Sequence, residues 1–259
     1  MAKASLRLSA ARILVTNDDG INAPGLKVLE KIARQLSRDV FVVAPEVEQS
    51  GAGHSLTLRR PLQVRRISAR RFAVDGTPTD CVLLAVNKLI EGKRPDLVLS
   101  GVNRGSNMGE DVTYSGTIAA AMEATLLNIP AVALSQMRDG TTVAWHVAAK
   151  YGAEVLRRLV SVPWPEGVLM NVNFPYLAKG GISGVQVVRQ GRRISNIEVT
   201  PVTDFAGRKY LWVGDFTSDH PQRHGTDLSA VQEKAIAITP LHLDLTHRGM
   251  MGRLKKAFA

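Results

Sequence analysis

Arg12-Ile-Leu-Val-Thr-Asn-Asp-Asp-Gly20 joins an apolar run to two adjacent carboxylates. The run is almost entirely apolar, which predicts a strand that is buried on both faces, as in a parallel sheet. Ligands bind at the carboxyl ends of such strands in open α/β sheets. An ionised carboxylate leaves water at a cost of several kcal/mol unless it is paired or bound to a metal ion. Asp18 and Asp19 therefore indicate a divalent cation, although an Asx-turn that closes the strand accounts equally well for the same four residues.

The first two-thirds of the chain alternate between short β-branched runs and helical stretches, which predicts a parallel sheet with crossover helices. A β-pair, 62–67 with 71–74, is expected beside that sheet, and Thr79 is the expected cap of the helix that follows it. The main strands are expected at 12–16, 40–44, 96–100, 131–135 and 168–173, and the helices at 24–37, 80–90, 116–127 and 145–160.

The pattern changes after about residue 180. Three weakly apolar segments, 185–189, 197–201 and 209–213, predict antiparallel strands in a projecting arm, and a helix at 228–234 with a strand at 235–239 returns the chain towards the core. We therefore expect a flexible leader at 1–11, a catalytic core at 12–180, and a hairpin arm with a C-terminal extension at 181–259.

Composition limits the class of protein. The chain has 259 residues, of which 45% are apolar, enough for one large α/β domain. No stretch approaches the roughly 18 apolar residues of a membrane span, so no membrane partner is expected. A single cysteine, Cys81, fits a reducing cytoplasm, which is the expected location. The formal charge of +10 favours anionic partners, but the basic pairs lack interleaved aromatics and no specific nucleic acid is expected.

Three predicted strands end in loops rich in oxygen donors: 16–20, 46–51 and 100–107. If the strands are neighbours in a parallel sheet, these loops meet at one edge. Carboxylates, a serine hydroxyl and an asparagine carbonyl are hard ligands that suit Mg²⁺, Mn²⁺ or Ca²⁺ rather than zinc.

Tyr114-Ser-Gly-Thr117 opens the expected helix at 116–127. Small residues at a helix start leave backbone N–H groups accessible, and the helix dipole favours an anion there. The segment is either a phosphate cradle or an ordinary helix cap, and the residues alone favour the cap.

Together these segments resemble the SurE family of metal-dependent nucleoside-monophosphate phosphatases. The resemblance is ordered along the chain and rests on several motifs: Ile13-Leu-Val-Thr-Asn-Asp-Asp-Gly-Ile-Asn-Ala-Pro-Gly25, Val43-Ala-Pro45, Gln49-Ser-Gly51, Gly76-Thr-Pro-Thr-Asp-Cys-Val82, Ser100-Gly-Val-Asn103, Tyr114-Ser-Gly-Thr-Ile-Ala-Ala-Ala-Met-Glu123, Asn171-Val-Asn-Phe-Pro175, Thr226-Asp227 and Ile238-Thr-Pro-Leu241. The chain departs from the family pattern at Ala120 and Ala124, and at Lys234-Ala235.

The resemblance implies a Rossmann-like α/β/α domain with a C-terminal extension that forms a homodimer or homotetramer. It implies hydrolysis of nucleoside 5′- and 3′-monophosphates and, for some members, of short polyphosphate. One divalent ion per subunit, Mg²⁺ or Mn²⁺, is expected. The matching positions are Asp18, Asp19, Ser50 and Asn103 for the metal, and Asn107, Ser115, Gly116 and Thr117 for the substrate phosphate, with Asp18, Asp19 and Asn107 as the catalytic set.

Several roles stay open at this point. Asp19 is a ligand only, a general base or a nucleophile that forms an aspartyl-phosphate. His54 is a general acid or a structural hydrogen-bonding group, and Arg104 contacts phosphate or is solvated. The alternative function is a basic nucleotide-binding or nucleic-acid-binding protein without turnover.

Overall fold

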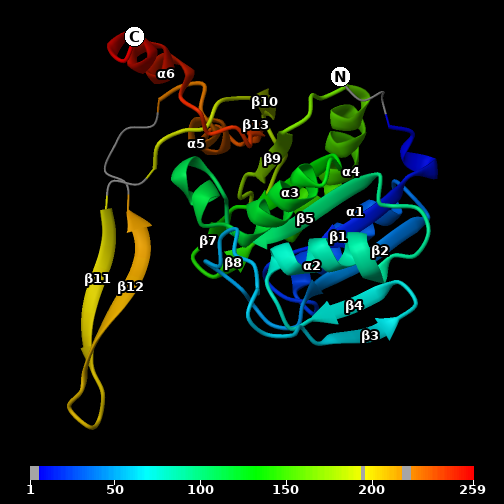
Figure 1. Ribbon diagram of the computed structural model, residues 1–259, viewed down its shortest axis with the longest axis horizontal. Coiled ribbons are helices and arrows are strands. Elements are labelled where there is room, and N and C mark those ends of the chain that lie inside the picture. The colour runs from blue at the N-terminus through cyan, green and yellow to red at the C-terminus, as the bar shows by residue number, and fades with distance from the viewer. Residues whose placement is uncertain (1–5, 194–195, 218–222) are drawn as a thin grey trace.

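The computed structural model describes residues 6–193, 196–217 and 223–259, and its centre is a large β-sheet (Figure 1). The strands of that sheet are β1 (Arg12–Thr16), β2 (Asp39–Pro45), β3 (Val64–Ser68), β4 (Arg71–Val74), β5 (Leu97–Arg104), β6 (Ala131–Gln136), β9 (Val168–Phe174), β10 (Gly184–Val187) and β13 (Ala235–His242). Within the described residues the order is β10-β13-β9-β6-β5-β1-β2-β4-β3. Neighbours pair parallel except β13 with β9 and β3 with β4. The expected α/β fold with a mostly parallel sheet is confirmed.

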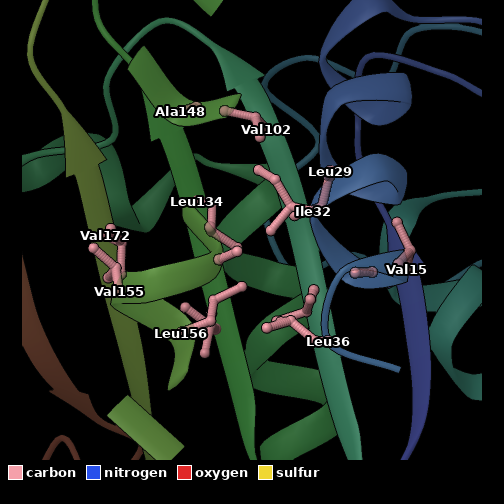
Figure 2. Packing of buried hydrophobic residues seen from close by; sticks show 14 of the residues in the cluster. Val15, Leu29, Ile32, Leu36, Val102, Leu134, Ala148, Val155, Leu156 and Val172 are labelled. Carbon is pink, nitrogen blue, oxygen red and sulfur yellow. The ribbon is translucent and has the colours of Figure 1, made fainter. Parts of the chain in front are cut away.

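Helices cover both faces of the sheet and make three layers. Helices α1 (Pro24–Arg34) and α4 (Trp145–Ser161) pack on one face, and α2 (Pro78–Leu84) and α3 (Gly116–Leu126) pack on the other. Successive strand residues point to opposite faces, so Val15 joins the α1/α4 core while Leu14 joins the α2/α3 core. Figure 2 shows Val15, Leu134 and Val172 of the strands meeting side chains of α1 and α4.

Helix α1 is amphipathic, as its spacing predicts. Its buried residues Leu26, Leu29, Ile32 and Ala33 recur at helical spacing and face the sheet. The helix ends at Arg34, short of the expected Ser37.

The expected cap of α2 was wrong by two residues. Thr77, not Thr79, caps the helix: its hydroxyl accepts from the amide of Asp80, and the Asp80 side chain accepts from the amide of Thr77. Pro78 takes the first helical position, where its missing N–H costs nothing. The α-helix ends at Leu84 and continues as a π-helical stretch to Leu89.

Two expectations about peripheral strands were also wrong. The β3–β4 pair is part of the main sheet, because β4 pairs parallel with β2. The segment expected as an arm strand at 185–189 is β10, which pairs parallel with β13 at the other sheet edge. Its partner lies about 50 residues further along the chain, so no local pattern could indicate the pairing.

The arm itself is a separate two-stranded hairpin. β11 (Asn196–Thr203) pairs antiparallel with β12 (Lys209–Thr217), and Figure 1 shows the hairpin extending away from the sheet. After it, α5 (Asp227–Gln232) and β13 return to the body, and α6 (Arg248–Ala257) follows. Helix α6 was not expected. It buries none of its own residues, and its two glycines lower helix propensity.

The expected leader at 1–11 falls partly outside the described residues, at 1–5. From residue 6 onward it contacts the body: Leu6 and Leu8 pack against the α1/α4 core. In the described part of the chain, the structure contains no helix with both the length and the apolar character needed to cross a membrane.

Candidate functional site

Three loops meet at the carboxyl edge of the sheet. β1 pairs with both β2 and β5, so the loops after these strands are neighbours. The amide of Gln49 donates to the backbone oxygen of Asp18 at 2.8 Å. The amide of Arg104 donates to Oδ2 of Asp19 at 3.2 Å. The loops after β2 and β5 therefore lie directly against the aspartate pair.

Asn103 is placed by an irregularity in β5. Pairing with β6 shifts register between Ser100 and Asn103, where Gly101 has a φ of +129°. A Cβ at Gly101 would lie 2.1 Å from the backbone oxygen of Leu134, so only glycine fits. Asn103 Nδ2 donates to the oxygen of Gly105 at 3.0 Å. That bond uses the amide nitrogen and leaves the carbonyl oxygen of the side chain for a cation.

Ser50 lies on the exposed loop after β2. Its hydroxyl donates to Glu48 Oε1 at 2.7 Å. A hydroxyl that donates its proton keeps its lone pairs for a second partner. Ser50 is thus chemically able to ligate a cation.

The carboxylate of Asp18 lies at the N-terminus of α3. The Thr117 hydroxyl donates to Asp18 Oδ1 at 2.5 Å, and the Thr117 amide also acts on this carboxylate. Ser115 caps the helix by accepting from the amide of Ile118. Gly116 lets the helix approach, because a Cβ there would lie 2.8 Å from Cβ of Asp18. The predicted cradle and the predicted cation site are therefore contiguous.

Both aspartates are held in an environment that disfavours their charge. Burial, together with the neighbouring charge of Asp19, raises the pKa of Asp18 to about 6, against the lowering effect of its bonds to Thr117. Burial also raises the pKa of Asp19; the Arg104 amide opposes the shift and the charge of Glu48 adds to it. No cationic side chain is among the groups that act on Asp18. A cation is the partner that this buried carboxylate lacks.

The surrounding donors fit a hard divalent ion. In the described part of the chain, no group of three or more His, Cys, Asp or Glu side chains is arranged to hold a metal. The predicted ligands, two aspartates with neutral oxygens, have instead the donor chemistry that suits Mg²⁺ or Mn²⁺. Beneath them, the hydroxyls of Thr16 and Ser100 are opposite each other in register. Both are buried without a hydrogen-bond partner among the described residues.

The raised pKa of Asp18 predicts a pH-dependent stability in the metal-free protein. Because the folded-state pKa of about 6 exceeds the unfolded value of 3.8, the associated stability is fully present below about pH 4 and is lost as pH rises through about 6. The difference corresponds to about 3 kcal/mol at pH 7. Urea unfolding in EDTA should show this loss, and Asp18→Asn should remove it. An identical pH slope in both proteins would contradict the assignment.

Asn107 belongs to a buried amide network that the sequence did not indicate. Its Nδ2 donates to Ser135 Oγ at 2.8 Å, and its amide donates to Asn173 Oδ1 at 2.9 Å. Asn171 and Asn173 both donate to the backbone oxygen of Asn107. The available signal was the pair of asparagines at alternate positions of β9, which share one face of an otherwise apolar strand.

The C-terminal extension braces the loop that carries Asn107. The buried carboxylate of Asp227 accepts from the amides of Gly109, Gly191 and Leu228. The extension thereby ties the loop after β5 to α5. This role for the Thr226-Asp227 motif was also missed, because its partners are far away in sequence.

His54 and Arg104 have side-chain partners other than the residues of the cradle. His54 Nε2 is 3.1 Å from Glu123 Oε2, and Glu123 is seven residues beyond Gly116 on α3. The amide of the residue before His54, Gly53, donates to the backbone oxygen of Tyr114 at 3.2 Å, so the loop that carries His54 lies against the segment that opens α3. The Arg104 guanidinium is exposed and lies 3.9 Å from Glu48.

The comparisons with known proteins agree with one another. The family model described as Survival protein SurE matches residues 13–196. The chain is 56% identical to the 5′-nucleotidase SurE of Paramagnetospirillum magneticum, an alignment that covers 96% of each chain. It is 53% identical to the 5′-nucleotidase SurE of Caulobacter vibrioides over 94% of this chain and 95% of that one. The crystal structure of the SurE protein from Aquifex aeolicus superposes with a TM-score of 0.83 at 39% identity, covering 96% of this chain and all of the other.

Proposed function

This chain belongs to the SurE family, and from that membership together with the site geometry we propose that it hydrolyses nucleoside 5′-monophosphates to a nucleoside and inorganic phosphate. It is then a phosphoric monoester hydrolase, like the relatives named 5′-nucleotidase. The observation that carries the proposal is the buried carboxylate of Asp18 at the N-terminus of α3. The names of the relatives favour hydrolysis over nucleotide binding without turnover.

We assign the metal to Asp18, Asp19, Ser50 and Asn103. When bound, a divalent ion supplies charge neutralisation for the phosphoryl oxygens and lowers the pKa of a water molecule. The support is the donor chemistry of the set and the lack of any cationic partner for Asp18. Asp19 is assigned as a ligand, held in place by the amide of Arg104.

The phosphate contacts are assigned to the start of α3 and the loop after β5. The helix N-terminus stabilises negative charge, and the residues Ser115, Gly116 and Thr117 are found there. Asn107 uses one N–H of its side-chain amide on Ser135, which leaves the second N–H for a phosphoryl oxygen. Donors held in place before the reaction stabilise charge that develops on the phosphoryl group.

A substrate panel tests the proposed function directly. Phosphate release is measured from nucleoside 5′- and 3′-monophosphates and from short polyphosphate, with Mg²⁺, Mn²⁺ or EDTA. We expect turnover of 5′-monophosphates that depends on the added metal and is lost in EDTA. Nucleotide binding without phosphate release under every metal condition would favour the binding-protein alternative. Release that persists undiminished in EDTA would contradict the metal assignment.

We further propose a homodimer or homotetramer in the cytoplasm. The hairpin of β11 and β12 supports an assembly, because it exposes large apolar side chains, among them Val199, Val202, Tyr210, Leu211, Trp212 and Val213. Exposed apolar surface of this kind marks contact sites. The 3′-nucleotidase and polyphosphatase activities are part of the same proposal and rest on the resemblance described above.

A further inference from the structure

A cleft of about 370 Å³ opens beside Asp19, on the side away from α3. Its lining includes Asp19 and Pro24, Glu48 from the loop after β2, and Arg104 at the end of β5. The remaining wall comes from Trp145 at the start of α4 and from the short hairpin of β7 (Arg138–Asp139) and β8 (Thr142–Val143). The volume is within the range of small-molecule sites.

The lining of the cleft has an apolar part and a polar part. Trp145, Val143 and Pro24 supply aromatic and apolar surface, whereas Glu48 and Arg104 supply an acceptor and donors. Glu48 and Arg104 are each more than half exposed and are 3.9 Å apart, so both can contact a ligand, while Glu48 Oε1 also accepts from Ser50. A nucleoside also has two such parts: a flat base that stacks on aromatic rings and a ribose that carries hydroxyls.

The indole of Trp145 is held in position by α1. A Cβ at Gly25 would lie 2.9 Å from Cη2 of Trp145 and 1.9 Å from the backbone oxygen of Val102. The glycine thus permits α1, β5 and the indole to come together. An aromatic side chain fixed in this way loses little conformational freedom when a ligand stacks on it.

The cleft is also correctly placed relative to the phosphate cradle. Asp18 contacts Thr117 of the cradle, and Asp19 lines the cleft. Asp18 and Asp19 are consecutive residues, so the cradle and the cleft lie on either side of the aspartate pair. The phosphate and the nucleoside of one nucleotide would then lie on either side of that pair.

We propose that this cleft binds the nucleoside part of the substrate, with the base against Trp145 and the ribose hydroxyls towards Glu48 and Arg104. The inference rests on the proposed function, because it assigns a substrate subsite to that reaction. It makes the nucleoside, and not only the phosphate, a source of substrate affinity.

The first test compares two substrates that differ only in the base. Trp145→Ala should lower kcat/KM for AMP on the order of 10-fold to 100-fold, the effect of losing a base–aromatic stack. It should leave hydrolysis of ribose 5-phosphate unchanged, since that substrate has no base. Trp145→Phe should restore most of the AMP activity. An equal loss on both substrates would overturn the inference and make Trp145 a purely structural residue.

The second test does not depend on turnover or on the packing of Trp145. Val143→Arg places a long cationic side chain at the mouth of the cleft from an exposed hairpin. Calorimetric titration with adenosine, which has no phosphate, should show at least about 10-fold weaker binding to this variant. Inorganic phosphate should bind both proteins equally. Unchanged adenosine affinity in Val143→Arg and Trp145→Ala would overturn the inference. Failure of the proposed function is a different result: no phosphate release from any nucleotide by the unaltered protein, whatever the adenosine affinity.

Discussion

Asp18→Asn is expected to reduce metal-dependent hydrolysis of nucleoside monophosphates by on the order of 10²-fold to 10³-fold, the usual effect of removing one charge-stabilising group. Asparagine keeps the shape of the side chain and an oxygen that can accept from Thr117. It removes the charge that attracts the cation. Asp19→Asn should act in the same direction. The measurements are phosphate release and Mn²⁺ affinity by calorimetry.

The fold should survive these changes, which separates a lost site from a lost structure. Because burial raises the pKa of Asp18 to about 6, the charged form costs free energy in the metal-free protein at neutral pH, and its neutral replacement should be as stable or more stable. Asp75→Asn is a matched control, because Asp75 is an exposed partner of Arg60 that is not among the proposed metal ligands or phosphate contacts. Full activity in both Asp18→Asn and Asp19→Asn would contradict the metal site.

The parts of the fold that were predictable have local signals. An apolar strand followed by an amphipathic helix specifies its own structure through residue spacing, which is why β1 and α1 lie where the pattern predicts. β10 has no such signal. Its residues alternate only between half-buried and exposed. Its place at the sheet edge is determined by its pairing with β13, which forms only in the folded chain. Helix α6 was missed although Met250, Met251 and Leu254 recur at helical spacing, because its two glycines weaken the helix signal.

In the candidate site, too, the residues with a local sequence signal were predicted and those that depend on distant partners were not. Asp18 and Asp19 were identifiable because two adjacent carboxylates at the end of an apolar strand are costly without a partner. The loops that lie beside these aspartates could also be predicted, because the carboxyl ends of neighbouring parallel strands share one edge of the sheet. The amide network around Asn107 was missed although the two asparagines on one face of β9 gave a signal. The three amides that donate to Asp227 gave none, because an aspartate at a helix start is an ordinary residue until its partners are known.

Gly116→Ala is the second substitution for which we expect a large loss of activity, because α3 approaches Asp18 closely at Gly116. The new Cβ would lie 2.8 Å from Cβ and 3.0 Å from Oδ2 of Asp18, and 3.1 Å from Cγ of Pro78. None of these atoms is the free end of a flexible side chain: Asp18 is buried beneath the helix and Pro78 begins α2. The start of α3 must therefore move, and Thr117 moves with it.

A small displacement is sufficient for a large kinetic effect, because a misplacement of about 1 Å can cost on the order of 100-fold in rate. We expect kcat/KM for nucleoside 5′-monophosphates to fall by about that factor, with a loss of unfolding free energy of about 1 to 3 kcal/mol from overpacking. Gly252→Ala is the matched control, since Gly252 is also helical and its Cβ would meet nothing within 4 Å. That variant should keep full activity and gain up to about 1 kcal/mol of helix stability.

The result for Gly116→Ala discriminates between the two explanations of the Tyr114–Thr117 segment. If the start of α3 is only a helix cap, the added methyl group lowers activity only through its contact with Asp18, so saturating metal should restore activity and KM for the nucleotide should stay unchanged. If it is the phosphate cradle, activity falls in protein that circular dichroism shows to be folded, and KM for the nucleotide rises along with the fall in kcat. The close contact of Gly116 with a proposed metal ligand makes the second outcome the expected one, because the same backbone shift disturbs the cation site and the phosphate site together.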